Sequence, residues 1–440
     1  MPKIGTPLFA KFLPHKYLHF TPFFYLCKKP LDMKKIAVYT VTSGLHDEAA
    51  VKSLSDAFLK GIFPDGDFDY EGSDFESFGT HALDLIYVRT GGAEGIFKAL
   101  LPELQAKGGK AFYLLTSGAS NSLAASLEIL SYLRQNGLQG EVLHGSNEYV
   151  AGRIALLCAA EQALKALEGM TLGVIGKPSD WLISSGADYA VLGKKLGLKV
   201  IDVPMEEMVA KIGLSAAEAT RQDMGVTAKL EVAEKVQAAL PGARQIHAAL
   251  RAIVAKYGLN ALTLRCFDLL TAVGNTGCLA LAALNTDGVP ASCEGDIPAL
   301  LSMMISQAAT GCTGFQANPA RIDVNTGEML FAHCTVPFNM VSGYNFDTHF
   351  ESGIGVGIHG ELPTGPVTVF KVSGDLNRCF AAEGHLLRNQ YEANLCRTQV
   401  VLKLRPEDAR YFLTDPIGNH HIIIPGSHAS LLKHIVCSLK

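Results

Sequence analysis

Short apolar runs alternate with amphipathic stretches from Met33 to about residue 205. The apolar runs predict buried strands at Ile36–Thr42, Leu83–Val88, Ala111–Leu115, Thr171–Ile175 and Lys199–Val203. Between them, leucines recur every three or four positions along Ser122–Asn136, which predicts a helix ended by Gly137. Strands that alternate with helices form βαβ units, so this part of the chain is expected to build parallel sheets covered by helices.

The pattern also indicates where one domain gives way to the next. A long helix predicted over Asn147–Leu167 is expected to lead from a first doubly wound domain to a second. From about residue 315, alternating β-branched segments follow one another without helices, at Pro366–Val372, Arg397–Leu404 and His421–Ile424. The predicted fold class is therefore α/β, with two doubly wound parallel-sheet domains (residues 33–150 and 151–315) and a β-rich, antiparallel, barrel-like C-terminal domain (residues 316–440).

The first 32 residues do not fit this pattern. Prolines at positions 7, 14, 22 and 30 would break any helix in this segment. The apolar stretch Phe20–Cys27 is shorter than most signal-peptide cores, and no small-residue cleavage site follows it. Met33 begins a sequence typical of a first cytosolic strand. We interpret residues 1–32 as an extension without a role in the fold, and the sequence leaves open whether the natural start is Met1 or Met33.

Composition and charge narrow the possible partners. Of the 440 residues, 48% are hydrophobic and the formal net charge is only -4, which argues against nucleic-acid or anionic-membrane binding. No apolar run reaches the length of a membrane-spanning helix. Ten cysteines are dispersed without a CxxC pair, as in reduced cytoplasmic proteins. Neither GxGxxG after the first strand nor GxxxxGK[ST] is present, so a nucleotide cofactor is not expected.

Candidate chemistry gathers in the second half of the chain. Eight of the 14 histidines lie in the last 108 residues: His333, His349, His359, His385, His420, His421, His428 and His434. Ahead of them, Cys293-Glu294-Gly295-Asp296 precedes a helix predicted over Ile297–Ala308, and Asp296 stands where its N-cap is expected. Glu294 has no such local role. Two interpretations remain: it is a metal ligand or general base, or it belongs to a buried ion pair.

Two further segments bring histidines to strand ends. A strand predicted over Met329–Ala332 delivers His333, and a Gly-Asn turn leads into His420 and His421. Neighbouring residues of a strand point to opposite faces, so only one of the latter two histidines can face a given pocket. A carboxylate and two histidines suit a divalent ion that keeps positions open for a pair of polyol oxygens. The polar loops at 89–92, 116–118 and 176–180 follow strands and are candidate ligand contacts, with plain turn chemistry as the alternative.

Several motifs occur in an order that resembles a known enzyme family. They are Ser120–Ala125 (SNSLAA), Gly176–Trp181 (GKPSDW), Cys293–Asp296 (CEGD), Phe315–Pro319 (FQANP), Ala332–Cys334 (AHC) and Gly418–His420 (GNH). Together they resemble the L-fucose isomerase/L-arabinose isomerase family, in particular its shorter fucose-isomerase-like members. The resemblance implies a homo-oligomer that interconverts aldose and ketose sugars through a cis-enediol on a divalent cation, usually Mn²⁺.

The resemblance also implies roles for particular residues. Glu294 matches the first acidic ligand and proton-transfer carboxylate, His420 or His421 the C-terminal histidine ligand, and His333 a further histidine at the metal. The second acidic ligand of the family falls on Asn318, whose neutral amide can bind a metal but cannot act as a base. Glu294 is then expected to carry most of the proton transfer, with Asp296, Asp323 or a metal-bound hydroxide as possible helpers.

Three functions follow from these observations. The first is a metal-dependent isomerase of a small sugar, with no nucleic acid or membrane as partner. The second is a sugar-binding relative that has lost catalysis, which the neutral Asn318 favours. The third is an isomerase of a modified or charged hexose. The residues do not identify the sugar or the number of subunits.

Overall fold

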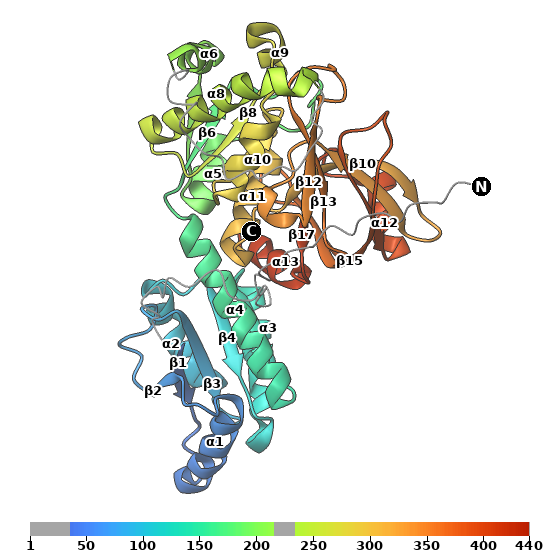
Figure 1. Cartoon of the computed structure of the whole chain (residues 1–440). Helices are drawn as coiled ribbons and strands as arrows, with labels where there is room; N and C mark the ends of the chain where they lie inside the picture. Colours follow the sequence, from blue (N-terminus) through green and yellow to red (C-terminus); the bar gives the residue numbers. More distant parts are fainter. Residues whose placement is uncertain (1–35, 215–233, 440) are drawn as a thin grey trace, which may run out of the picture. The chain divides into compact units, whose positions relative to one another are not determined.

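A computed structural model describes residues 36–214 and 234–439 (Figure 1). The chain divides into two units, Met1–Met33 and Lys34–Lys440, and every element below belongs to the second. The extension predicted over residues 1–32 lies outside the described residues. Within the described part, no helix is both long and apolar enough to cross a membrane.

The first sheet is parallel and has helices on both faces. Its strand order is β2-β1-β3-β4-β5. The strands are β1 (Ile36–Val41), β2 (Phe68–Gly72), β3 (Leu83–Val88), β4 (Ala111–Leu115) and β5 (Gln139–Leu143), and the helices are α1 (Glu48–Ile62), α2 (Glu94–Ala106), α3 (Ser122–Gln135) and α4 (Asn147–Leu167), with a 3-10 turn at Ala119–Asn121. Side chains alternate across β1, so Tyr39 packs with α2 and α3 whereas Val38 packs with α1 and α4. The sheet is therefore doubly wound.

The second sheet repeats this plan with strand order β7-β6-β8-β9, again parallel. Its strands are β6 (Thr171–Ile175), β7 (Lys199–Val203), β8 (Ala261–Leu264) and β9 (Ala291–Cys293), and its helices are α5 (Tyr189–Leu196), α6 (Met205–Leu214), α8 (Glu234–Tyr257), α9 (Asp268–Val273), α10 (Cys278–Thr286) and α11 (Ile297–Thr310). Helix α4 serves both sheets, because Ile154 belongs to the core of the first and Leu167 to that of the second.

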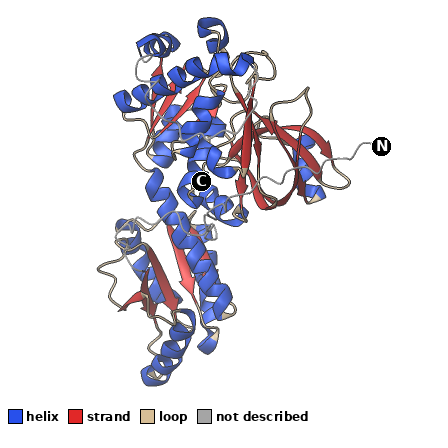
Figure 2. Cartoon of the chain, in the orientation of Figure 1, coloured by secondary structure: helices blue, strands red, loops and turns tan. Residues whose placement is uncertain are grey.

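The C-terminal part is a closed antiparallel barrel in the order β10-β11-β16-β15-β14-β17. Its strands are β10 (Phe315–Asp323), β11 (Glu328–His333), β14 (Gly365–Val372), β15 (Cys379–Gln390), β16 (Thr398–Leu404) and β17 (His421–Pro425). A hairpin of β12 (Gly343–Asp347) and β13 (Gly357–Glu361), a 3-10 turn at Phe338–Met340, and helices α12 (Pro406–Thr414) and α13 (Ala429–Cys437) complete it. Figure 2 shows the strands of this part gathered with few helices among them.

Helix α11 joins the second sheet to the barrel. Its apolar residues, including Leu301, share one core with Leu172 of β6 and with Phe370 of β14. Pro298 is tolerated in its first turn, and Gly311 ends it in the left-handed conformation. The N-terminus of α11 is thereby fixed at the junction between a parallel sheet and a barrel.

The structure confirms the predicted fold class: parallel sheets with flanking helices, followed by an antiparallel barrel. The helix predicted over Ser122–Asn136 is α3, one residue shorter, and α4 has the predicted bounds. The short strands β8 and β9 were not predicted, because their residues lie in an apolar region without a clear period. The domain boundaries at residues 150 and 315 stay predictions.

Replacement of the fully buried Leu301 by Ala should lower the free energy of unfolding by about 2–5 kcal/mol, because a cavity would remain between sheet and barrel. The matched control is Leu127→Ala on α3, where the side chain is 52% exposed and the cost should stay within about 0.5 kcal/mol. Urea unfolding followed by circular dichroism measures both. Equal losses for the two variants would contradict the role assigned to α11.

Candidate metal centre

Glu294 directly follows β9 and has an unusual backbone conformation. Its φ is 66°, in the left-handed region, which costs a non-glycine residue about 1–2 kcal/mol. The backbone N–H of Ser179 donates to the Glu294 carbonyl at 2.9 Å. Gly295 also has a positive φ of 73°, and a Cβ there would lie 2.5 Å from the Lys177 carbonyl oxygen. The loop after β6 thus fixes the strained turn that carries Glu294.

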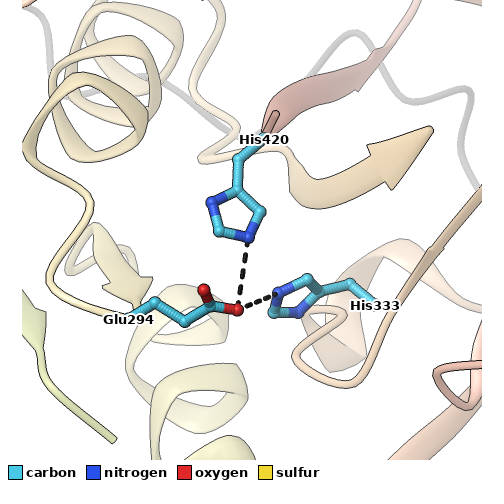
Figure 3. A group of neighbouring side chains, drawn as sticks. All are labelled: Glu294, His333 and His420. Carbon is cyan, nitrogen blue, oxygen red and sulfur yellow. Dashed lines mark ion pairs between the residues drawn. The ribbon is translucent and has the colours of Figure 1, made fainter. Parts of the chain in front are cut away.

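Two histidines from the barrel meet the Glu294 carboxylate. His333 is the last residue of β11, and His420 immediately precedes β17. Glu294 Oε1 lies 3.9 Å from His333 Nε2 and 3.4 Å from His420 Nε2 (Figure 3). One ligand atom from each of the three residues lies within 4.8 Å of the others, and all three residues are buried. Residues far apart in the sequence therefore form one compact group of metal-ligating side chains.

The histidines and the indole of Trp181 determine the state of the Glu294 carboxylate. Burial raises the pKa of Glu294, but the adjacent His333 and His420 lower it by more, so the net pKa is well below its usual range. The second oxygen, Oε2, accepts a hydrogen bond of 2.7 Å from Trp181 Nε1. Glu294 is therefore ionised at neutral pH, and Oε1 is the oxygen turned toward the histidines.

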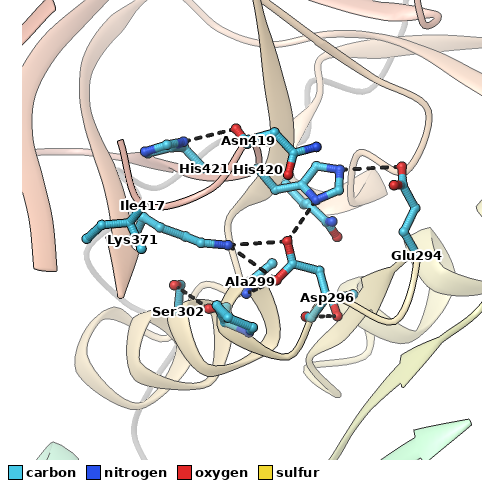
Figure 4. A network of polar contacts seen from close by, with 12 residues as sticks. Glu294, Asp296, Ala299, Ser302, Lys371, Ile417, Asn419, His420 and His421 are labelled. Carbon is cyan, nitrogen blue, oxygen red and sulfur yellow. Dashed lines mark hydrogen bonds and ion pairs between the residues drawn. The ribbon is translucent and has the colours of Figure 1, made fainter. Parts of the chain in front are cut away.

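Asp296 orients His420 from the opposite side of the ring (Figure 4). His420 Nδ1 lies 2.9 Å from Asp296 Oδ2, which leaves Nε2 facing Glu294. Burial lowers the pKa of His420, but Asp296 and Glu294 raise it to about 9. A carboxylate that accepts from the far nitrogen is the usual support of a metal-bound histidine, because it fixes the tautomer and the ring orientation.

Asp296 is itself held by two more partners. Its side chain caps α11 through the Ala299 N–H at 2.7 Å, as the sequence predicted. Lys371 Nζ lies 3.3 Å from both carboxylate oxygens, and the two side chains are 1% and 0% exposed. Burial raises the pKa of Asp296, but Lys371 and His420 lower it to about 2. Burial lowers the pKa of Lys371 against the opposing effect of Asp296, and both side chains are shielded from water.

His421 does not join the group. In Figure 4 its ring is turned away from Glu294, as expected for adjacent residues at the start of a strand. Its Nδ1 lies 3.1 Å from the Asn419 carbonyl oxygen and its Nε2 lies 3.2 Å from the Tyr411 hydroxyl. Burial is the main reason that its pKa falls to about 3. Of the two histidines named from the sequence, His420 is the one at the candidate metal centre, and His421 is a packing residue of the barrel.

Asn318 lies beside the group without a contact to it among the described hydrogen bonds and ion pairs. It is on β10, and continuing the β10–β17 register by one residue beyond Ala317–His421 places it opposite His420. Its Oδ1 accepts a hydrogen bond of 3.0 Å from Asn419 Nδ2. A role for Asn318 as a metal ligand therefore stays a prediction. Asp323 is at the far, exposed end of β10, where it accepts from the Asn325 N–H, so it does not assist Glu294.

Sequence reasoning gave no role to three residues that contact Glu294 or its near neighbours in the chain, Cys293 and Asp296. Lys371 is an isolated lysine in the apolar strand β14, which is the only sequence signal for it. Trp181 lies within a quoted motif, but nothing local predicts its bond to Glu294. Gln316 lies in another motif, and its Oε1 accepts from the Cys293 N–H at 2.8 Å. Each of these contacts spans more than 20 residues, so only the tertiary structure reveals it.

Fold and site together define an α/β chain with a C-terminal barrel and a buried candidate metal centre of one carboxylate and two histidines. No protein-family model matches the chain. Over 272 residues it is 25% identical to the sulfoquinovose isomerases of Priestia aryabhattai and Priestia megaterium, an overlap that covers 57% of this chain. Over 115 residues it is 31% identical to the sulfoquinovose isomerase of Clostridium sp. (strain MSTE9), which covers 26% of this chain and 24% of that relative. The chain spans 58% of the length of the two Priestia relatives.

Asp296→Asn should lower the free energy of unfolding by about 3–5 kcal/mol, because it leaves Lys371 as a buried charge without its partner. Adding Lys371→Met should restore part of this loss, since the double variant buries no unpaired charge. Urea unfolding of the two single variants and the double variant gives the coupling energy. A double variant as unstable as the sum of the singles would contradict a buried ion pair.

Proposed function

We propose that this protein is a metal-dependent aldose–ketose isomerase that acts on a monosaccharide. The observation that carries the proposal is the group Glu294, His333 and His420, in which the fully buried His420 Nε2 has no hydrogen-bond partner among the described residues. Similarity to the Priestia and Clostridium sulfoquinovose isomerases supports the same class of reaction. A cytoplasmic homo-oligomer is the state that we propose from the family resemblance.

The three side chains fit a divalent cation. Cis ligands of an octahedral ion with bonds of about 2.1 Å lie about 3 Å apart, and Glu294 Oε1 lies 3.4 and 3.9 Å from the two histidine nitrogens. A small inward movement would therefore bring them into a coordination sphere with open positions. We propose Mn²⁺ as the ion, from the resemblance, although two imidazoles with one carboxylate also suit Zn²⁺.

The chain's own residues would divide the chemistry among them. When bound, the cation would hold the sugar oxygens at C1 and C2 and stabilise the negative charge that develops on them. Glu294 would accept the proton from C2 of the aldose and return it to C1, while the hydroxyl proton moves from O2 to O1 through solvent water, so that aldose and ketose contain the same atoms. Asp296 would keep His420 in the tautomer that leaves Nε2 free for the cation. Trp181 would keep Glu294 Oε2 in place through its indole N–H.

The substrate that we propose is a hexose, with sulfoquinovose as the first candidate to test. The support is the name of the three relatives. The neutral Asn318 favours a second function, a sugar-binding protein without turnover, because a two-carboxylate site would be reduced to one. Incubation with Mn²⁺ and a panel of aldoses and ketoses that includes sulfoquinovose, followed by NMR, distinguishes the two: an isomerase exchanges aldose and ketose, whereas a binding protein leaves each sugar unchanged.

Glu294→Gln should lower isomerisation by at least about 100-fold, because it keeps the size of the side chain and removes its charge and basicity. The affinity for Mn²⁺ should fall as well, which titration calorimetry measures separately from turnover. His421→Gln is the matched control, since His421 packs in the barrel away from the centre, and it should leave Mn²⁺ affinity unchanged. Parent-like turnover of Glu294→Gln would remove this carboxylate from the reaction.

Asn318→Asp tests whether this position faces the cation. If it does, the added carboxylate should tighten Mn²⁺ binding and increase the shift in thermal midpoint that Mn²⁺ produces. If the side chain only pairs with Asn419, the new charge should lower stability without increasing that shift. Thermal unfolding with and without Mn²⁺ separates the two outcomes by their sign.

A further inference from the structure

Two buried polar atoms near Glu294 have no hydrogen-bond partner among the described residues, and the candidate metal centre gives them no role. Among the described residues, Ser179 Oγ, Gln316 Nε2 and His420 Nε2 are buried without a hydrogen-bond partner. His420 Nε2 faces Glu294 and has a role in the proposed coordination. Ser179 and Gln316 are only 2% and 1% exposed, and their free atoms have no such role. Buried polar atoms of native proteins are almost always paired with protein, water or ligand, so these two call for a partner.

Both atoms are tied closely to the turn that carries Glu294. The Ser179 N–H donates to the Glu294 carbonyl at 2.9 Å, and Oγ is three bonds from that nitrogen. Gln316 Oε1 accepts from the Cys293 N–H at 2.8 Å, and Nε2 shares its carbon with that oxygen. The residues approach from separate elements, the loop after β6 and strand β10. Both residues are thus hydrogen-bonded to the backbone of the same strained turn.

The position of Ser179 in the second sheet points to a ligand independently. Strand β6 pairs with β7 on one side and β8 on the other, so the chain changes direction across the sheet at this strand. Ligands of open α/β sheets bind outside the carboxyl ends of the strands at such a switch point. The loop between β6 and α5 contains both Ser179 and Trp181, whose indole N–H donates to Glu294.

We infer that Ser179 and Gln316 bind a hydroxyl group of the sugar and determine which sugar the site accepts. The inference rests on the proposed function for the nature of the ligand. A hydroxyl group can accept from Gln316 Nε2 and can donate to Ser179 Oγ, and these are the bonds that the two residues lack. A sugar without a hydroxyl at that position would leave the two buried groups unpaired and would bind more weakly.

Ser179→Ala tests this inference, because it removes one oxygen and leaves the backbone bond to Glu294 intact. Removal of an unpaired buried hydroxyl should keep or raise the thermal midpoint. The dissociation constant of the sugar should rise about 5- to 10-fold, the usual worth of one neutral hydrogen bond. Trp181 is the only tryptophan of the chain, and its contact with Glu294 makes its fluorescence a reporter of sugar binding that does not require turnover.

Ser306→Ala is the matched control. Ser306 is fully buried near the other end of α11, and its hydroxyl donates to the Cys312 carbonyl at 2.7 Å. This variant should lose stability and keep the sugar affinity of the parent, the reverse of Ser179→Ala. Gln316→Glu is a second variant at the site: it keeps an oxygen for the Cys293 N–H and removes the donor, so it should also weaken sugar binding.

The outcomes separate this inference from the proposed function. If the parent binds a sugar of the panel without converting it, the proposal of an isomerase is contradicted. If Ser179→Ala then weakens that binding, the inference about Ser179 and Gln316 is still supported. If Ser179→Ala and Gln316→Glu bind the sugar as tightly as the parent does, the inference is overturned whatever the turnover. A parent that binds no sugar of the panel, with or without Mn²⁺, overturns both.

Discussion

A buried carboxylate at the start of α11 is the constraint on which the candidate centre depends. Asp296 caps the helix, pairs with Lys371 of β14 and holds the ring of His420, so one side chain connects the second sheet to two places in the barrel. A buried charge is tolerated only when its partners are present with good geometry. The relative position of helix, strand and histidine is therefore coupled to the ionisation of a single group.

The same junction explains why the ligating residues come from distant parts of the chain. Glu294 directly follows β9, the edge strand of the second sheet, whereas His333 ends barrel strand β11 and His420 directly precedes β17. Helix α11 packs in one core with the second sheet and with the barrel, and this packing brings the ends of their strands together. The strained backbone at Glu294 persists because Ser179 and Gln316 hold the atoms around it. Strain maintained by several contacts is typical of positions where the geometry of a side chain matters for function.

The charges around His420 suit either role considered for Glu294, a metal ligand or a buried ion pair. Glu294 and Asp296 both contribute to the raised pKa of His420, and Lys371 offsets only Asp296. His420 Nε2 lies 3.4 Å from Glu294 Oε1, so the two side chains form an ion pair when His420 carries a proton on that nitrogen. A divalent ion would replace that proton and engage both residues together with His333. With Glu294 as its one carboxylate, the group of Glu294, His333 and His420 carries less negative charge than a two-carboxylate site, and ligand charge is one of the main determinants of affinity for a divalent ion.

By itself, the sequence determined the fold class and the candidates for chemistry. The alternation of apolar runs and amphipathic helices is a local property, so β1, β3, β4 and α4 were predictable from neighbouring residues. The cap of α11 by Asp296 was predictable for the same reason. Only the tertiary structure decided between His420 and His421, because the choice depends on which face of β17 meets the end of β9. Only the tertiary structure revealed the contacts of Lys371, Trp181 and Gln316 with the residues around Glu294. Hydrogen bonds between distant segments produce no periodic pattern in the sequence from which they could be predicted.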